Sequence, residues 1–198
     1  MIRRLPLIPT LLVLAAAAVM VGLGLWQLRR AHEKEALIAR YAAAEGLPPT
    51  VWPTRPMGDK DLPLFRRATG MCLQPVANKA VAGRNRRGES GYSHLVDCRT
   101  GGLEGPGMRV DTGWSRDPRA GGGWKGGPVG GIIGPDSEKR MRLISDRGFA
   151  GLEPSAEPDV ADVPNNHRSY AFQWFAFAVT ALVIYALALQ ARLREPRP

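Results

Sequence analysis

An uninterrupted apolar run near the C-terminus constrains the fold more than any other feature of the sequence. The segment 169–191 contains 23 residues, and none of them carries a charge. Because a helix rises about 1.5 Å per residue, this segment is long enough to cross a hydrocarbon core of about 30 Å. We therefore expect a transmembrane helix that begins near His167.

A second apolar run lies at the other end of the chain, from Leu5 to Leu28, and is also free of charged residues. A signal peptide has a shorter apolar region of about 7–15 residues, so we expect an uncleaved membrane anchor. Strong helix formers continue the pattern to Glu45, where Gly46 ends it. Leu37, Ile38 and Tyr41 give this extension an apolar side that is expected to lie against the middle domain.

Small side chains on the two helices predict that they pack against each other. On the first helix, Ala18, Gly22 and Trp26 recur at four-residue spacing. On the second, spacings of three and four residues place one stripe on a single face: His167, Tyr170, Ala171, Trp174, Ala178 and Ala181.

The basic residues that flank the two runs set the expected orientation. The net charge of +9 is densest at the chain ends, where only Glu195 opposes the arginines: Arg3, Arg4, Arg192, Arg194 and Arg197. An excess of Lys and Arg just outside a membrane span marks the cytoplasmic side. We therefore do not interpret the positive charge of this chain as a nucleic-acid-binding surface. Both termini are therefore expected in the cytoplasm. The middle of the chain is expected in the periplasm of a bacterium, although Arg29, Arg30 and Lys34 favour the opposite orientation for the first helix.

The middle of the chain, residues 47–163, is divided by glycines and prolines into short runs of β type. These runs are Leu64–Leu73, Gly91–Arg99, Met108–Ser115, Val129–Ile133 and Arg140–Asp146. We expect a small antiparallel sheet or a partly open barrel. The predicted fold class is therefore an α+β membrane protein, in which two antiparallel transmembrane helices, within residues 1–46 and 164–198, flank a β-rich periplasmic domain.

The only two cysteines, Cys72 and Cys98, fall on two predicted strands on the oxidising side of the membrane. A disulfide bond between them would add about 3 kcal/mol of stability. Two other interpretations stay open. The cysteines can be buried thiols that act as small hydrophobic residues, or they can form a copper site with His94, because soft thiolates bind Cu(I).

Patterns that carry catalysis are sparse in this sequence. No Gly-x-Ser-x-Gly motif occurs, and His32, His94 and His167 do not have the spacing of a metallohydrolase site. A periplasmic enzyme would need a clustered nucleophile and base. We expect that the protein is not an enzyme.

Two blocks of sequence carry a resemblance to a known family. The first is Gly24-Leu25-Trp26-Gln27-Leu28-Arg29-Arg30, followed by Lys34. The second is Pro164-Asn165-Asn166-His167, followed by Tyr170-Ala171, Gln173-Trp174-Phe175 and Ala178. Gly91-Tyr92 and Val110-Asp111-Thr112-Gly113-Trp114 lie between them. In order and spacing these blocks resemble the surfeit locus protein family of cytochrome c oxidase assembly factors.

The resemblance implies a protein that helps to build the haem a and copper centres of oxidase subunit I, with haem a bound transiently in bacterial members. Its implied partners are subunit I, other oxidase assembly factors and the lipid bilayer, and nucleic acid is not among them. The chain departs from the family where Thr112 replaces an arginine and Asp111 an asparagine. A role of that arginine does not carry over to Thr112, although Arg109 and Arg116 are close in sequence.

With the resemblance, His167 is the expected ligand of the haem iron at the outer surface of the membrane. Further residues are expected to wall the macrocycle, to pair with its propionates or to reach its second axial position: Tyr170, Trp174, Trp26, Arg29, Arg30, Arg168 and His32. From the residues alone, a histidine at a helix start is more often a helix cap or an interface hydrogen-bonder than a ligand. Aromatic residues at a bilayer edge are ordinarily interfacial anchors.

Two other functions share this outline. Polysaccharide chain-length regulators also carry a span at each end of a periplasmic middle, but their middle is long and rich in helix. Copper delivery through Cys72, His94 and Cys98 is a variant of the assembly function.

Overall fold

The computed structural model describes residues 6–101 and 107–194. The expectations placed on Arg3, Arg4, Leu5, Glu195 and Arg197 lie outside the described residues. The chain divides into two compact units. One combines the chain up to Leu37 with the chain from Pro164 onward, and the other is Ile38–Val163.

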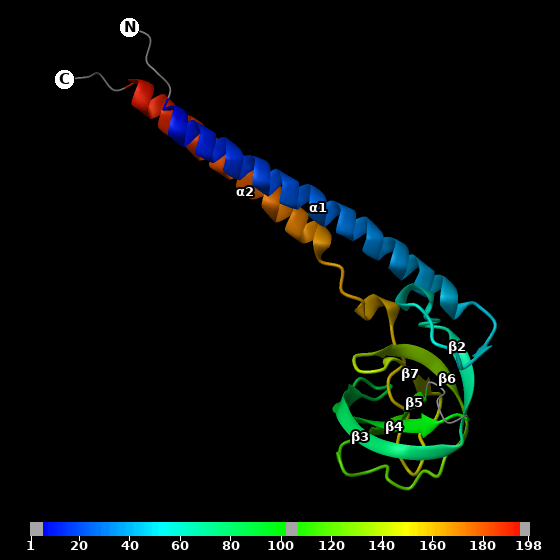
Figure 1. Ribbon diagram of the computed structural model, residues 1–198. Coiled ribbons are helices and arrows are strands. Elements are labelled where there is room, and N and C mark those ends of the chain that lie inside the picture. The colour runs from blue at the N-terminus through cyan, green and yellow to red at the C-terminus, as the bar shows by residue number, and fades with distance from the viewer. Residues whose placement is uncertain (1–5, 102–106, 195–198) are drawn as a thin grey trace. The chain divides into compact units, whose positions relative to one another are not determined.

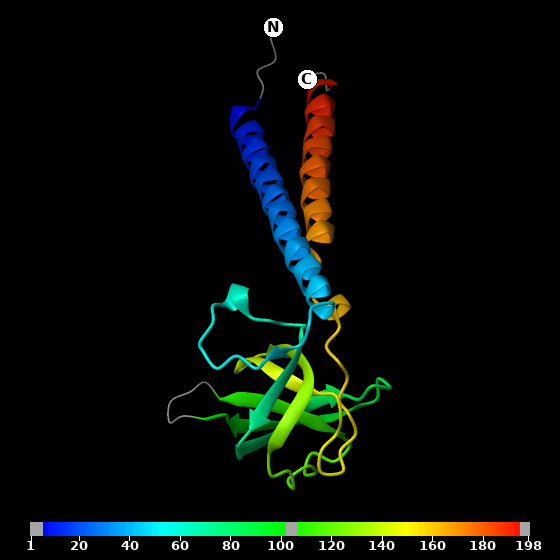
Figure 2. The ribbon, with the colours of Figure 1, turned by 90° about the vertical axis from the view of Figure 1, so that its right-hand side faces the viewer.

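Two long helices form the first unit, as the apolar runs predict. They are α1, Leu7–Glu45, and α2, His167–Arg194, and they lie side by side and antiparallel (Figures 1 and 2). Both are long and apolar enough to cross a membrane. α1 ends at the residue before Gly46, where the sequence predicts its end.

The contact between α1 and α2 follows a repeat that alternates three and four residues, which we call the helix seam. Small buried residues, among them Ala17, Gly24 and Ala171, let the two backbones approach. On α1 the seam contains Thr10, Val13, Ala17, Met20, Gly24, Gln27 and Ala31, and on α2 it contains His167, Ala171, Trp174, Ala178, Ala181 and Tyr185. This spacing is the heptad pattern of two helices that remain in contact over many turns.

The packing face predicted for α1 was wrong. The side chain of Trp26 is 51% exposed, and a Cβ built on Gly22 meets nothing within 4 Å. A four-residue step overshoots a full helical turn by about 40°, so Ala18, Gly22 and Trp26 drift away from a straight contact. The stripe predicted on α2 holds except for Tyr170, which is 51% exposed.

A single curved sheet of seven strands forms the second unit (Figure 2). The strand order is β1-β2-β6-β7-β5-β4-β3. The bounds are β1 Thr50–Val51, β2 Arg67–Cys72, β3 Gln74–Arg84, β4 Ser90–Arg99, β5 Met108–Ser115, β6 Gly127–Asp136 and β7 Arg140–Ser145. Among the described residues, one short 3-10 helix, Asp59–Asp61, lies between β1 and β2, and another, Val160–Asp162, follows β7.

The sheet is mixed, which corrects the prediction of an antiparallel sheet. β1 pairs with β2 and β5 pairs with β7 in parallel, while the other four pairings are antiparallel. The β6–β7 hairpin lies between β2 and β5, so β7 meets β5 through a non-local pairing. Local alternation of residues does not specify such a pairing.

One face of the sheet carries the hydrophobic core. Its buried members come from five strands and from the segment that precedes β2: Trp52, Leu64, Phe65, Ala68, Cys72, Val96, Cys98, Met108, Val110, Val129, Ile133 and Leu143. The last turns of α1 belong to this unit, and the Tyr41 ring lies 4.8 Å from the Phe65 ring. Tyr41, one of the residues of the apolar side predicted for the helical extension, therefore packs on the β domain.

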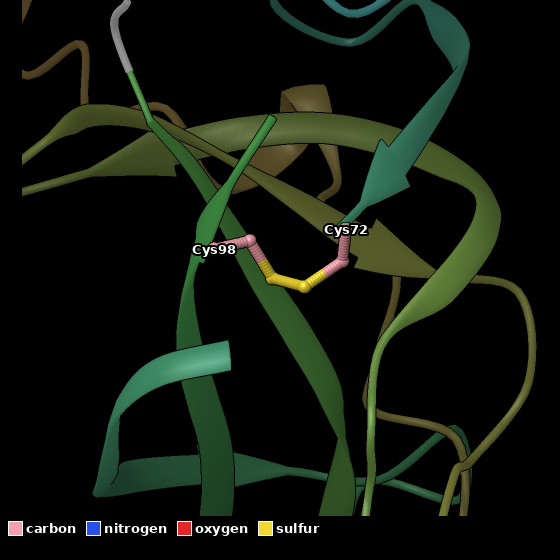
Figure 3. The surroundings of a disulfide bond; sticks show 2 residues. All are labelled: Cys72 and Cys98. Carbon is pink, nitrogen blue, oxygen red and sulfur yellow. A yellow bond between two sulfur atoms is a disulfide. The ribbon is translucent and has the colours of Figure 1, made fainter. Parts of the chain in front are cut away.

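A disulfide bond joins Cys72, at the end of β2, to Cys98 in β4 (Figure 3). Both cysteines are buried in the core, and 26 positions separate them in sequence. The bond links two strands that are not neighbours in the sheet. It is the first of the three arrangements that the sequence left open.

Candidate functional site

The helix seam becomes polar at the end where α2 begins. There the Nδ1 atom of His167 lies 2.7 Å from the Oε1 atom of Gln27, across the contact between α2 and α1. Both side chains are half-buried. This pair joins residues 140 positions apart in the sequence, and it exists because the two helices are antiparallel and in contact.

The partner of His167 determines which ring nitrogen carries the proton. An amide oxygen only accepts hydrogen bonds, so Nδ1 of His167 donates to Gln27. In the neutral imidazole, Nε2 then holds a lone pair. Within the described part of the chain, Nε2 has no hydrogen-bond partner, so it is the atom that can bind a metal.

Two further contacts hold the helices together on either side of this pair. A Cβ built on Gly24 would lie 2.6 Å from the Phe175 ring, so only glycine lets that ring lie against α1. Farther along α1, Arg168 donates two hydrogen bonds to the Glu35 carboxylate, at 2.7 and 3.0 Å. The pair of Gln27 and His167 therefore sits between a close backbone contact and a bidentate ion pair.

The other residues predicted to bind haem lie on different sides of the helix seam. Because each residue turns the helix by about 100°, Trp26, Arg30 and Tyr170 fall on one flank of the seam, which we call the tryptophan flank. His32 falls on the opposite flank, together with the Arg168 and Glu35 pair. Arg29 points away from α2.

Trp174 is the one predicted aromatic wall that lies within the seam itself. It is half-buried, and its ring centroid lies 6.3 Å from that of Phe177 in an edge-to-face arrangement. Arg30 also donates a hydrogen bond of 2.8 Å to Glu33, one turn along α1. Of the predicted haem contacts, Trp174 therefore lies in the seam with His167. Trp26, Arg30 and Tyr170 fall on one flank of the seam, and Arg29 and His32 do not fall on that flank.

A second histidine, His94 of β4, lies in the β domain and is fully buried. The Ser115 hydroxyl donates to the carbonyl of Asp117, so the Nε2 atom of His94 donates to Ser115, at 2.9 Å. Nδ1 is buried and has no partner among the described residues. Burial lowers the pKa of His94, although Asp117 opposes this shift.

The loop after β5 covers the His94 ring. Gly121 adopts a φ of +81°, and a Cβ there would lie 3.2 Å from Cγ of His94. Cys72 and Cys98 are joined to each other, so neither offers a thiolate beside this histidine. The copper arrangement of Cys72, His94 and Cys98 therefore lacks its soft ligands in this structure.

The positions at which the chain departs from the family pattern are both buried in β5. The Thr112 hydroxyl donates to the carbonyl of His94, at 2.9 Å, and so has a structural partner. Asp111 is 1% exposed and accepts hydrogen bonds from the Ser155 hydroxyl and the Gly113 amide. Burial raises the pKa of the Asp111 carboxyl.

Of the two arginines near Thr112 in sequence, Arg109 is buried and Arg116 is exposed. The Arg109 side chain is 6% exposed and forms ion pairs with Asp97, Asp136 and Glu138. Its hydrogen bonds hold the pKa of Asp97 below the usual range. The Arg116 side chain is 78% exposed and reaches Glu89 at 3.4 Å.

Sequence reasoning missed Gln27 as part of the site. A signal was present, because Gln27 is the one polar residue within the run of small and apolar residues from Gly24 to Leu28. Gly24, Gln27 and Ala31 also share one helical face. The four-residue spacing predicted for α1 instead placed Ala18, Gly22 and Trp26 on the face toward α2, and that face does not include Gln27.

The fold and the site together define a class of protein: a β domain connected at both ends to long apolar helices, which hold a half-buried histidine where their polar ends pair. A family model described as the SURF1 family matches residues 14–179, which include the whole sheet, most of α1 and the first turns of α2 with His167. The chain therefore belongs to the SURF1 family, a cytochrome oxidase assembly family. No curated protein matches the chain in a sequence search.

Proposed function

We propose that this protein is a membrane-anchored assembly factor for haem-copper (cytochrome c) oxidase, which binds haem a through His167 and positions it for insertion into subunit I. The main support is the family match over residues 14–179, since it covers most of α1, the whole sheet and the start of α2, where His167 lies. The protein acts by binding and positioning, without catalytic turnover.

In this proposal α1 and α2 span the bacterial inner membrane, both termini lie in the cytoplasm and the β domain lies in the periplasm. The length and apolar character of the two helices support the spans. The disulfide between Cys72 and Cys98 supports an oxidising compartment for the β domain, because such bonds are rare in the cytosol.

The residues at the polar end of the helix seam fit haem as cargo. His167 offers Nε2 as an axial ligand, since Gln27 occupies Nδ1. Trp174 in the seam, with Trp26 and Tyr170 on the tryptophan flank, supplies aromatic surface for the macrocycle. Arg30 on the same flank supplies a guanidinium for a propionate.

His32, Arg29 and Arg168 are left out of the proposed haem contacts. His32 and Arg168 lie on the flank opposite to Trp26, and Arg29 points away from α2. Arg30 would have to exchange its ion pair with Glu33 for the propionate. A single protein ligand on a half-exposed surface suits a carrier, because cargo that must be handed over cannot be held too tightly.

The alternative functions receive less support. Copper delivery would need thiolates, and Cys72 and Cys98 are bonded to each other. A polysaccharide chain-length regulator would have a helix-rich middle, whereas residues 50–145 form a seven-stranded sheet.

Deletion of the gene, followed by complementation, tests the proposal. The deletion strain is expected to lose haem a from its oxidase, and the wild-type gene is expected to restore it. His167→Ala is expected to restore little, while His32→Ala, on the opposite flank, is expected to behave as wild type. Membrane levels of each variant are measured by immunoblot. A normal haem a content in the deletion strain would contradict the proposed function.

A further inference from the structure

We propose that Gln27 is a positioning residue: it holds His167 in the tautomer that carries its proton on Nδ1, and so keeps the Nε2 lone pair ready for a metal. The inference rests on the proposed function, because a ligand for Nε2 gives this arrangement its purpose. It assigns a role to a residue of α1 that does not itself touch the iron.

The hydrogen bond supports this role through its atoms and its length. The 2.7 Å distance joins Nδ1 of His167 to the carbonyl oxygen of the Gln27 side chain, which can only accept. Both residues lie in the helix seam, where neighbouring side chains restrict their rotamers. The imidazole is therefore held in one orientation and one protonation pattern before any ligand arrives.

Close packing of the helices makes this bond possible. Gly24 lies one turn before Gln27, and the Phe175 ring occupies the space that a Cβ at Gly24 would fill. Ala171, one turn after His167, is buried at the same contact. These small residues bring α1 near enough for the Gln27 side chain to reach His167 directly.

The chemistry of metal-binding histidines gives the bond its consequence. A histidine that binds a metal through one nitrogen usually donates its other N–H to an acceptor, which fixes the tautomer and makes the ligating nitrogen more basic. Loss of such an acceptor typically weakens metal binding about 10- to 100-fold. Without Gln27, the proton can move to Nε2, and a protonated Nε2 cannot ligate iron.

The tautomer can be measured without haem. Nitrogen-15 NMR of full-length protein, labelled at histidine and held in detergent, distinguishes Nδ1–H from Nε2–H for each ring. The chain has 3 histidines, so the spectrum of His167→Ala identifies the His167 signals. We expect the Nδ1–H form in the wild type.

Two substitutions at Gln27 and one control separate the acceptor from the packing. Gln27→Leu removes the acceptor and is expected to shift His167 toward Nε2–H. Gln27→Glu keeps an acceptor and is expected to retain Nδ1–H. Gln173→Leu is the matched control, since Gln173 is an exposed glutamine of α2 outside the seam. An Nε2–H tautomer in the wild type, or an unchanged tautomer in Gln27→Leu, would overturn the inference.

Haem titration of the same samples then tests the consequence. Gln27→Leu is expected to bind haem about 10- to 100-fold more weakly than wild type, and Gln27→Glu and Gln173→Leu are expected to bind within a few-fold of it. Equal affinity in Gln27→Leu, despite a changed tautomer, would refute the positioning role. If wild type itself binds no haem, the proposed function fails, and the NMR result alone decides whether Gln27 sets the tautomer.

Discussion

His94 in the β domain and His167 at the helix pair differ in whether a ligand can reach their second ring nitrogen. Each has one ring nitrogen in a hydrogen bond, to Ser115 for His94 and to Gln27 for His167. The other nitrogen of His94 is buried beneath the loop of Gly121, whereas that of His167 lies on a half-exposed residue. A ligand can reach only the second.

The surroundings of the two histidines differ in the same sense. In the β domain, charges such as Arg109 and Asp111 are buried and engaged with partners, so they hold the sheet together. At the helix pair, small residues bring two polar side chains into contact and leave a ring nitrogen for a ligand. Changes in the β domain should therefore alter stability, and changes at the polar end of the helix seam should alter ligand binding.

The largest effect on stability is expected from Arg109→Ala. This change leaves Asp136, whose side chain is 3% exposed, without its closest cation. Loss of one partner from a buried ion pair typically costs about 3–5 kcal/mol of unfolding free energy. Chemical denaturation of the full chain in detergent measures it. Arg140→Ala removes an exposed ion pair with Asp59 and should cost less than about 1 kcal/mol. Equal costs would contradict a structural role for the buried cluster.

The double substitution of Cys72 and Cys98 by alanine should rank next. Loss of a cross-link over 26 positions is expected to cost about 3.5 kcal/mol in the loop-entropy account. The midpoint of thermal unfolding should fall, while the NMR signals of His167 should not move. A shift of those signals would show that the β domain and the helix pair depend on each other. That result would contradict the separation of stability from binding.

Asp111→Asn is expected to stabilise the β domain by about 1–2 kcal/mol near neutral pH, because burial of the carboxylate outweighs its ion pair with Arg142 at 3.8 Å, and the amide keeps an oxygen for Ser155. The folded state raises the pKa of Asp111, so wild-type stability falls as pH rises from the ordinary value of 3.8 through the folded value. Denaturation curves between pH 4 and 8 should lose this decline in the variant. A less stable variant at neutral pH would show that the charge itself is needed.

Among the buried residues of the β domain, the smallest effect is expected for His94→Gln, at about 1 kcal/mol near neutral pH. The folded state lowers the pKa of His94 below its ordinary value of 6.5. Its contribution to stability is therefore complete above pH 6.5 and is lost as pH falls through the folded value. The variant should show a flatter stability profile below pH 6.5, together with unchanged haem binding. Impaired haem binding in His94→Gln would contradict the assignment of haem binding to the helix pair rather than to the β domain.

The sequence predicted the parts of the fold that depend on length and local pattern. The apolar runs predicted α1 and α2, and Gly46 predicted the end of α1. Glycine-rich breaks predicted β2 and β4 to β7 to within a few residues. β3 was missed because both of its faces are largely exposed, so its residues show little alternation.

The pairing between distant segments could not be predicted in the same way. The parallel contact of β5 with β7 depends on where a hairpin inserts. The hydrogen bond between Gln27 and His167 depends on how α1 and α2 are rotated about their own axes. The predicted α1 face contained Trp26, the neighbour of Gln27, so this bond was not predicted. The proposed ligand, His167, came from the sequence motif, whereas the acceptor that orients it came only from the structure.

Haem absorbance of the purified full-length protein tests the central claim most directly. Wild type, His167→Ala and His94→Gln are loaded with haem under identical conditions, and their absorbance spectra are compared. His167→Ala is expected to lose the spectrum of the ligated haem, and His94→Gln is expected to retain it. An unchanged spectrum in His167→Ala would contradict the assignment of His167 as the ligand and, with it, the proposed haem site at the polar end of the helix seam.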